Sequence, residues 1–140
     1  MQPKPEFTSI SPGNLVAVTE IDLGALAEIY DEMDIYLSIY MKSASTADLD
    51  ASRSHISSRF RVMEKSLPSE LRESFQKTVS LAQEAIESPS WKGERSRVIL
   101  ASSPESFLHV YRMGLEAEPL VVLDTSPFLL PLARLRDEYL

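Results

Sequence analysis

The sequence contains no cysteine, four glycines and two histidines among its 140 residues. Without cysteine, disulfide bonds, thiolate catalysis and sulfur-ligated metal sites are excluded. The glycines are isolated from one another, so the Gly-rich loops of nucleotide-binding proteins are absent. No apolar run reaches the length of about 18 residues that a membrane-spanning helix needs, and the first residues lack the hydrophobic core of a signal peptide. We therefore expect a cytoplasmic protein that does not enter a membrane.

The sequence also offers no arrangement of side chains that is typical of a catalytic or metal site. His55 and His109 belong to different predicted elements, and neither has a second ligand at the spacing that zinc sites use. The Gly-x-Ser-x-Gly turn of the α/β-hydrolases is missing as well. We therefore predict no catalytic residues, no metal and no cofactor, and we do not expect this chain to be an enzyme by itself.

Length and composition indicate one globular domain. With 44% of its residues apolar and 25% charged, a chain of 140 residues can bury a core of its own. Residues 1–18 include Pro3, Pro5 and Pro12, which favour an extended conformation. We expect an extended arm over residues 1–18 and a single α/β domain over residues 19–140.

Residues 35–41 are the most clearly predicted element, a strand near the middle of a sheet. All of them except Ser38 have large apolar side chains, and many are β-branched or aromatic, which favours a buried pleated surface. A polar loop over residues 42–46 follows. Residues 48–67 then predict an amphipathic helix, because apolar side chains recur there at helical spacing: Leu49, Ile56, Phe60, Met63 and Leu67. A further helix should start at Pro68 and pair with it as a hairpin on one face of the sheet.

The remaining elements complete a sandwich. Strands are predicted over residues 97–101, 107–113 and 120–123, and a last helix has Pro131 in its first turn. A first helix of about four turns should begin near a capping box formed by Thr19 and Asp22. Its apolar stripe consists of Leu23, Leu26, Tyr30 and Met33. The predicted order is α-β-α-α-β-β-β-α, a mixed sheet of about four strands covered by helices.

The net charge of −7 is distributed unevenly. Residues 20–34 hold six acids and no base, whereas residues 51–65 hold four bases against Glu64 alone. A basic helix in an acidic protein suits a local contact with RNA, although such charge runs are more often solvated faces. The acidic stretch 20–34 gives an alternative, a helix that contacts a protein partner.

Three segments carry a family resemblance. Leu37-Ser38-Ile39-Tyr40 is similar to the opening strand of the N-terminal domain of archaeo-eukaryotic peptide chain release factors, and residues 120–135 are similar to the end of that domain. The segment from His55 to Arg59 resembles the loop and helix start that reads Asn-Ile-Lys-Ser followed by Arg in true release factors. The match is closer to the divergent bacterial and archaeal branch of this superfamily, which includes peptidyl-tRNA hydrolases.

The resemblance implies a domain that docks on the ribosome or on tRNA in translation termination or rescue. It puts the RNA contacts on the basic helix: Arg53, His55, Ser57, Ser58, Arg59, Arg61 and Lys65. Among these, Arg53, Arg61 and Lys65 are predicted to share one helix face, and Arg59 to point elsewhere. His55 and Ser57 replace Asn and Lys of the motif, so stop-codon reading is not implied. The catalytic Gly-Gly-Gln belongs to a middle domain that would follow Leu140, which makes this chain the N-terminal domain of a longer protein. The competing hypothesis is an acidic protein-interaction or regulatory domain.

Overall fold

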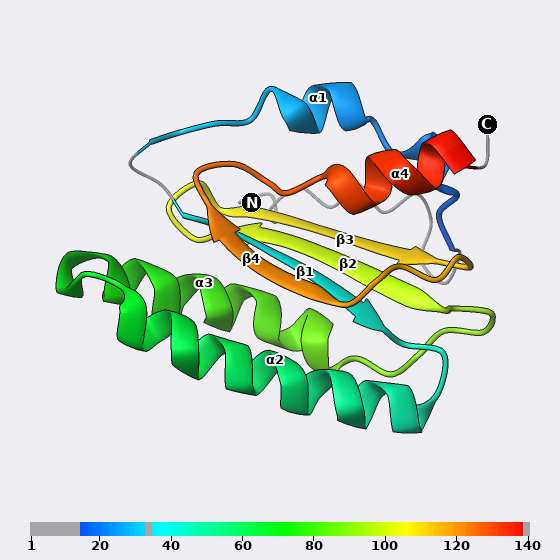
Figure 1. Ribbon diagram of the computed structural model, residues 1–140, viewed down its shortest axis with the longest axis horizontal. Coiled ribbons are helices and arrows are strands. Elements are labelled where there is room, and N and C mark those ends of the chain that lie inside the picture. Colours follow the sequence, from blue (N-terminus) through cyan, green and yellow to red (C-terminus); the bar gives the residue numbers. More distant parts are fainter. Residues whose placement is uncertain (1–14, 33–34, 139–140) are drawn as a thin grey trace, which may run out of the picture.

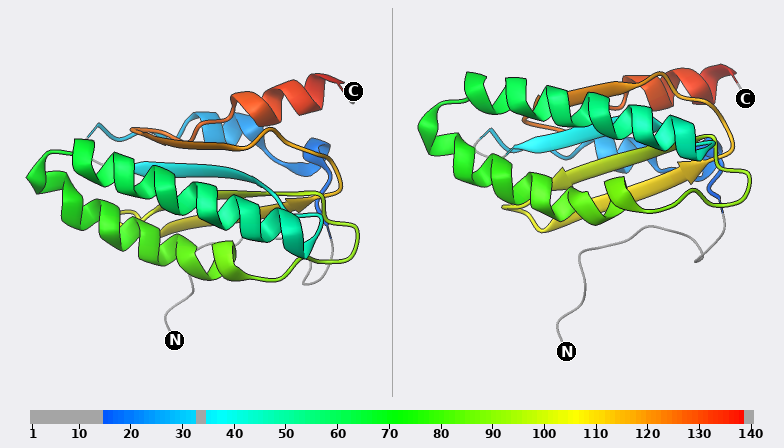
Figure 2. Two further views of the ribbon diagram at one scale, coloured as in Figure 1. Left: turned by 60° about the horizontal axis from the view of Figure 1, so that its bottom comes forward. Right: turned by 90° about the horizontal axis from the view of Figure 1, so that it is seen from below.

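The protein is an α/β sandwich in which a four-stranded sheet lies between two layers of helices (Figures 1 and 2). The computed structural model describes residues 15–32 and 35–138. The single α/β domain expected from the sequence is confirmed. In chain order the elements are η1 (Val18–Glu20), α1 (Leu23–Ala27), β1 (Tyr36–Lys42), α2 (Thr46–Ser66), α3 (Ser69–Glu87), β2 (Ser96–Ser102), β3 (Phe107–Met113), β4 (Leu120–Asp124) and α4 (Leu130–Glu138).

The sheet has the strand order β3-β2-β1-β4, and all three pairings are antiparallel, so the expected mixed sheet is corrected to an antiparallel one. The connections explain this. Helices α2 and α3, with 21 and 19 residues, run out and back over nearly equal lengths, so the chain returns to the end of β1 before β2 begins. A single crossover helix would instead have returned it to the other end and given parallel strands.

The helical hairpin of α2 and α3 covers one face of the sheet (Figure 1). Helix α2 starts where Ser45 Oγ accepts a hydrogen bond from the Asp48 N–H at 3.1 Å, and Pro68 occupies the N-cap of α3. The predicted hairpin is thus confirmed. Both helices place apolar side chains over β1 and β2, and the buried cluster includes Leu37, Ile39, Met41, Leu49, Ile56, Ala82, Ile86 and Ile99.

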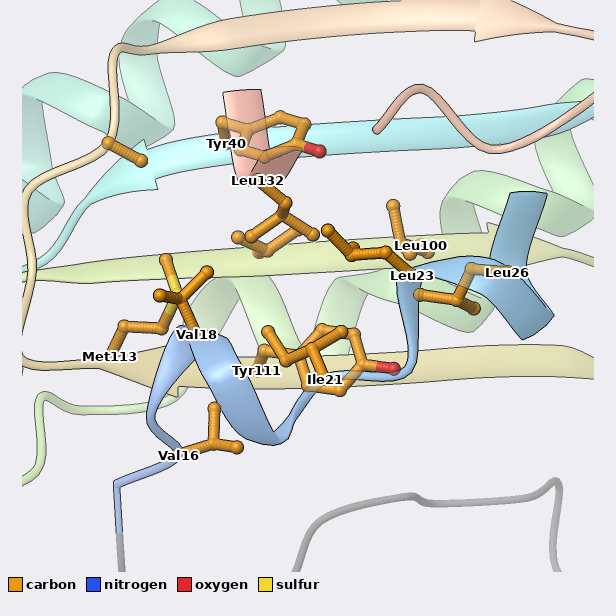
Figure 3. Packing of buried hydrophobic residues seen from close by; sticks show 12 residues of the cluster. Val16, Val18, Ile21, Leu23, Leu26, Tyr40, Leu100, Tyr111, Met113 and Leu132 are labelled. Carbon is orange, nitrogen blue, oxygen red and sulfur yellow. The ribbon is translucent and has the colours of Figure 1, made fainter. Parts of the chain in front are cut away.

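The opposite face is covered by η1, α1 and α4 (Figure 3). Because side chains alternate along a strand, Tyr40 and Leu100 point to this side and meet Leu132 of α4. Ser38, the polar residue buried within β1, accepts a hydrogen bond through Oγ from the Phe128 N–H at 2.9 Å, and the Tyr40 hydroxyl donates to the Phe128 carbonyl. These two bonds hold the segment before α4 against the sheet.

The long acidic helix predicted within residues 20–34 does not form. Helix α1 contains five residues, and Asp22 caps it by accepting a hydrogen bond from the Ala25 N–H at 3.0 Å. Leu23 and Leu26 are buried, but Tyr30 is 63% exposed, and Met33 lies outside the described residues. An acidic stretch without bases has no ion pairs between successive turns to prolong a helix. Instead the Asp31 N–H bonds to the Thr125 carbonyl at 3.1 Å, which carries the chain towards the sheet.

The predicted capping box of Thr19 and Asp22 is wrong in both members, because Thr19 lies inside η1 and Asp22 is the N-cap of α1, not an acid in its first turn. Most of the predicted arm, residues 1–14, lies outside the described residues. Its end is buried on the domain: the Val16 N–H bonds to the Arg112 carbonyl of β3 at 2.8 Å. None of the helices in the described ranges is long and apolar enough to cross a membrane.

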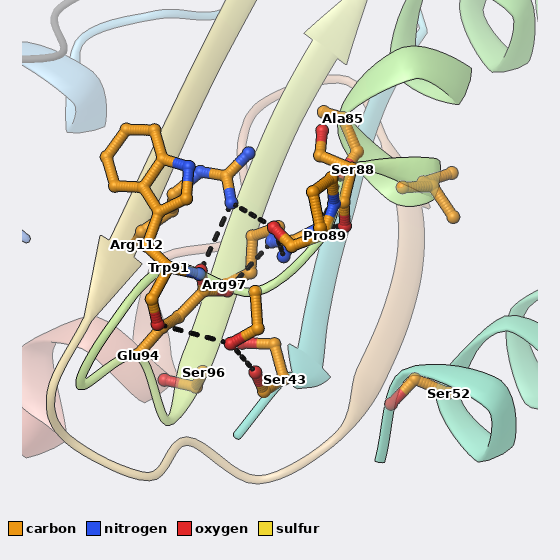
Figure 4. A network of polar contacts seen from close by, with 12 residues as sticks. Ser43, Ser52, Ala85, Ser88, Pro89, Trp91, Glu94, Ser96, Arg97 and Arg112 are labelled. Carbon is orange, nitrogen blue, oxygen red and sulfur yellow. Dashed lines mark hydrogen bonds and ion pairs between the residues drawn. The ribbon is translucent and has the colours of Figure 1, made fainter. Parts of the chain in front are cut away.

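A buried polar network joins the sheet to the end of α3 (Figure 4). The Arg97 side chain on β2 has no exposed surface, and its Nε donates to Glu94 Oε2 at 2.9 Å. Its Nη atoms donate to the carbonyls of Ala85, Ser88 and Pro89 at 2.7, 2.9 and 3.2 Å. These carbonyls belong to the last turn of α3 and the residues after it, where a helix leaves its acceptors without internal donors.

Glu94 completes this network. Its carboxylate, also without exposed surface, accepts from Arg112 Nη1 at 3.1 Å and from the Trp91 N–H at 3.0 Å, and the Arg112 guanidinium lies over the Trp91 ring. Burial alone would raise the pKa of Glu94, but the nearby Ser43 hydroxyl, the Trp91 N–H and the charged Arg97 outweigh it and hold this pKa below its ordinary value. Burial lowers the pKa of Arg97 and its bond to Glu94 opposes this, so the guanidinium stays charged.

We predict that Glu94→Gln destabilises the fold by about 3 kcal/mol at pH 7, because it leaves Arg97 buried without a counter-charge. The pKa of Glu94 is lowered in the folded state, so its contribution is complete above the unfolded pKa of about 4.3 and is lost as the pH falls through the folded value. The difference in Tm between wild type and variant should therefore narrow below about pH 4.

Glu84→Gln serves as the control, since Glu84 is exposed on α3 and the same charge is removed. A Glu94→Gln variant as stable as this control at neutral pH would contradict the role assigned to the network.

Candidate functional site at the tip of the helical hairpin

The basic side chains of this protein fall into two groups, those paired within the fold and those that are not. Lys42 and Arg95 both lie within 3.2 Å of the Glu116 carboxylate, and Lys77 pairs with Glu73 at 3.6 Å. The buried arginines are paired as described above. A base that is paired with a carboxylate attracts an external anion only weakly. The bases that can bind an anionic partner are therefore those without a carboxylate beside them.

Three such bases meet at the turn between α2 and α3. Arg61 and Lys65 of α2 and Arg72 of α3 line, together with Glu64, a hollow of about 360 Å³. All three bases are exposed. Arg61 Nη2 donates to Ser58 Oγ at 3.3 Å, while Lys65 and Arg72 make no hydrogen bond or ion pair within the described part of the chain. We call these four residues the tip cluster.

The hairpin turn, and with it the tip cluster, projects beyond the sheet (Figures 1 and 2). At the turn α2 ends with Ser66 and α3 begins with Ser69, so Leu67 and Pro68 alone connect them. The other end of the hairpin is joined to β1 and β2 by the chain itself. The tip cluster thus lies on the part of the hairpin that a large partner can reach without meeting the sheet.

Arg53, the first base in the predicted RNA-contact set, has a different role. Its Nε donates to the Ile86 carbonyl at 3.0 Å, and its Nη2 donates to the Glu87 and Ser88 carbonyls at 2.8 and 3.1 Å. Its Nε also lies 3.3 Å from the Glu87 carboxylate. Arg53 therefore caps the end of α3 opposite the turn. The predicted common patch of Arg53, Arg61 and Lys65 is corrected, because only the last two come together.

The other residues of that set lie along α2 between these two ends. His55 to Arg59 were compared with a loop and helix start, yet they lie in the middle of α2. His55 and Ser57 are exposed, and Ser58 holds Arg61. Arg59 is half-buried and lies outside the tip cluster, as its predicted direction implied. Of the predicted RNA-contact residues, Ser58, Arg61 and Lys65 thus lie together near the turn, and His55 lies apart from them.

His55 instead borders a larger groove of about 420 Å³ between α2, the end of β1 and residues 118–119. Two polar side chains of this groove are bonded within the fold. Asp48 Oδ2 accepts from the Ala44 N–H at 3.2 Å, and Ser52 Oγ donates to the Lys42 carbonyl at 2.8 Å. The lining also includes the exposed carboxylate of Glu118. Of the two hollows, the tip cluster is the one that gathers several exposed cationic side chains.

Arg72 is absent from the sequence-based set of RNA-contact residues, all of which lie before Pro68. A short turn at Pro68 makes residues at similar distances on either side of it face each other. Arg72 follows Pro68 by four positions and Lys65 precedes it by three. Gln76 Nε2 and Glu64 Oε2, 2.6 Å apart, also join the two helices across the hairpin. The hairpin prediction combined with this symmetry could have found Arg72.

We predict that Arg53→Gln lowers the stability of the fold by about 1–3 kcal/mol, since it removes donors from three carbonyls at a helix end. Arg61→Gln and Arg72→Gln, with the same change in charge, should stay within about 0.5 kcal/mol of wild type. Thermal or urea unfolding of the three variants measures this. Equal losses in all three would mean that the tip arginines also support the fold.

No protein-family model matches this chain, and no curated protein matches it significantly. The resemblance to release-factor N-terminal domains accordingly remains an expectation from the sequence.

Proposed function

We propose that this domain docks onto RNA through the tip of its helical hairpin, as the N-terminal domain of a release-factor-like protein that engages the ribosome or tRNA. The observation that carries the proposal is the tip cluster, where bases of two helices converge on one hollow without a full set of internal partners. Lys and Arg bind the phosphates of nucleic acids, which set affinity and register. Such a role is a cytoplasmic one.

The distribution of charge supports a contact in which the hairpin tip, and not the opposite side of the sheet, meets the RNA. On the opposite side of the sheet, the acids of η1, α1 and the following residues are exposed: Glu20, Asp22, Glu28 and Glu32. These exposed acids of η1, α1 and the following residues repel a polyanion, and the three bases of the tip cluster attract one, so the tip is the end presented to RNA even though the net charge is −7. Local charge, and not total charge, decides the contact at physiological salt, where screening limits interactions to about 8 Å.

The domain itself supplies binding and no reaction in this proposal. Among residues 15–32 and 35–138, no group of three or more histidine, aspartate or glutamate side chains is placed to hold a metal ion. Any hydrolysis of peptidyl-tRNA would be carried out by another domain that this one positions.

We predict that binding to ribosomes, or to a short single-stranded RNA, weakens steeply with salt, and that Arg61→Gln/Lys65→Gln/Arg72→Gln flattens this dependence. Each phosphate contact to a single strand contributes about 0.7 to the slope of log K against log salt, so losing three contacts should reduce the slope by roughly 2. Co-sedimentation and fluorescence anisotropy across a salt series measure the effect.

The matched control is Lys77→Gln/Lys92→Gln/Arg134→Gln, which removes the same charge from three exposed positions outside the tip cluster. It should keep the wild-type slope. Identical slopes in both triple variants would show that RNA contacts the protein elsewhere, and no binding at low salt would end the proposal.

A second candidate function is a protein contact through the acidic layer. The observation in its favour is Tyr30, which is 63% exposed and is flanked by Glu28 and Glu32. Tyrosine is enriched in the energetic centres of protein interfaces. The triple variant Arg61→Gln/Lys65→Gln/Arg72→Gln separates the two candidates: it should weaken binding to RNA at the tip, and it should leave the binding of a protein partner near Tyr30 unchanged.

A further inference from the structure

The hollow of the tip cluster has a charge and a shape that suit one kind of RNA phosphate better than the others. Three cationic groups and the carboxylate of Glu64 line it, so its lining is positive overall. We infer that it seats the terminal phosphate of an RNA strand, the phosphomonoester at a 5′ or 3′ end, and binds internal phosphodiesters less tightly. The inference rests on the proposed RNA docking and specifies the ligand of that site.

Charge is the first reason. A phosphomonoester carries a charge of about −1.5 to −2 at neutral pH, because its second pKa is about 6. An internal phosphodiester carries a single negative charge. Since the Coulomb energy scales with the charge of the ligand, the same three bases attract the terminal group about one and a half to two times as strongly.

The arrangement of the three bases is the second reason. Arg61 and Lys65 approach the hollow from α2, and Arg72 approaches from α3. A terminal phosphate has three free oxygens, one for each base, and it can enter a hollow because the strand continues on one side only. An internal phosphate has two free oxygens and is flanked by the strand on both sides. Guanidinium groups favour such contacts because they donate two parallel hydrogen bonds.

Glu64 makes contact with all three bases necessary. Gln76 Nε2 lies 2.6 Å from its Oε2, and this hydrogen bond from α3 holds the carboxylate in the lining. The carboxylate repels every phosphate that enters, and it repels the more highly charged terminal group more strongly. A group that contacts all three bases at once offsets this repulsion, whereas a group that contacts only two of them offsets less of it. The number of bases contacted, and not the ligand charge alone, then decides which phosphate binds.

The experiment compares three RNA oligonucleotides of one sequence, with a 5′ phosphate, with a 3′ phosphate, or with both ends dephosphorylated, each carrying an internal fluorophore. Binding to the full chain is followed by anisotropy at low ionic strength. We expect one or both phosphorylated forms to bind about five- to tenfold more tightly than the dephosphorylated form. The difference between the two phosphorylated forms tells which strand end enters the hollow.

The variants Arg72→Gln and Lys77→Gln lie on the same helix and change the charge equally, but Lys77 is paired with Glu73 outside the hollow. Arg72→Gln should remove the preference for a terminal phosphate and retain weaker binding, and Lys77→Gln should keep it. Equal binding of all three oligonucleotides, or a preference that survives in Arg72→Gln, overturns this inference and leaves RNA docking standing. Failure of all three to bind overturns the proposed function as well.

Discussion

The buried guanidinium of Arg97 connects the two main parts of this structure, the sheet and the helical hairpin. It projects from β2 into the end of α3 and satisfies carbonyls that the helix cannot satisfy internally. Helix α3 has no basic residue in its own last turn, so the positive charge that favours a helix C-terminus comes from β2 and, through Arg53, from α2. Glu94 makes the burial of this charge tolerable, since an unpaired guanidinium would be strongly destabilising there.

This arrangement gives the two ends of the hairpin different properties. At the end near the sheet, the bases are bonded to carbonyls and carboxylates, and the chain connects both helices to strands. At the turn, the bases of the tip cluster have exposed side chains and few internal contacts. In the proposed function, the bonded end fixes the hairpin on the sheet and the charged turn meets the RNA, so the site is formed before binding and does not have to fold on contact.

Sequence patterns predicted strand β1 and the helical hairpin correctly, and the structure shows why. Strand β1 was recognisable because both its faces are buried between the helix layers, so apolar residues follow one another with Ser38 as the exception. The hairpin was recognisable because Pro68 marks the change from one helix to the next. The prediction of a long first helix was wrong because Tyr30 and Met33 continue the helical spacing of apolar residues in the sequence. In the structure the helix ends at Ala27, and the Asp31 N–H bonds to the Thr125 carbonyl.

The sequence by itself determined the strands, the helical hairpin, the one-domain architecture and the presence of a basic helix, since these depend on local spacing, turn residues and composition. The tertiary structure alone decided which bases are free. Arg53 and Arg61 look alike in the sequence, yet one caps α3 and the other faces the tip hollow, because pairing depends on groups that arrive from distant parts of the chain. The antiparallel strand order and the addition of Arg72 to the candidate site have the same origin, the close approach of segments whose contact no local pattern encodes.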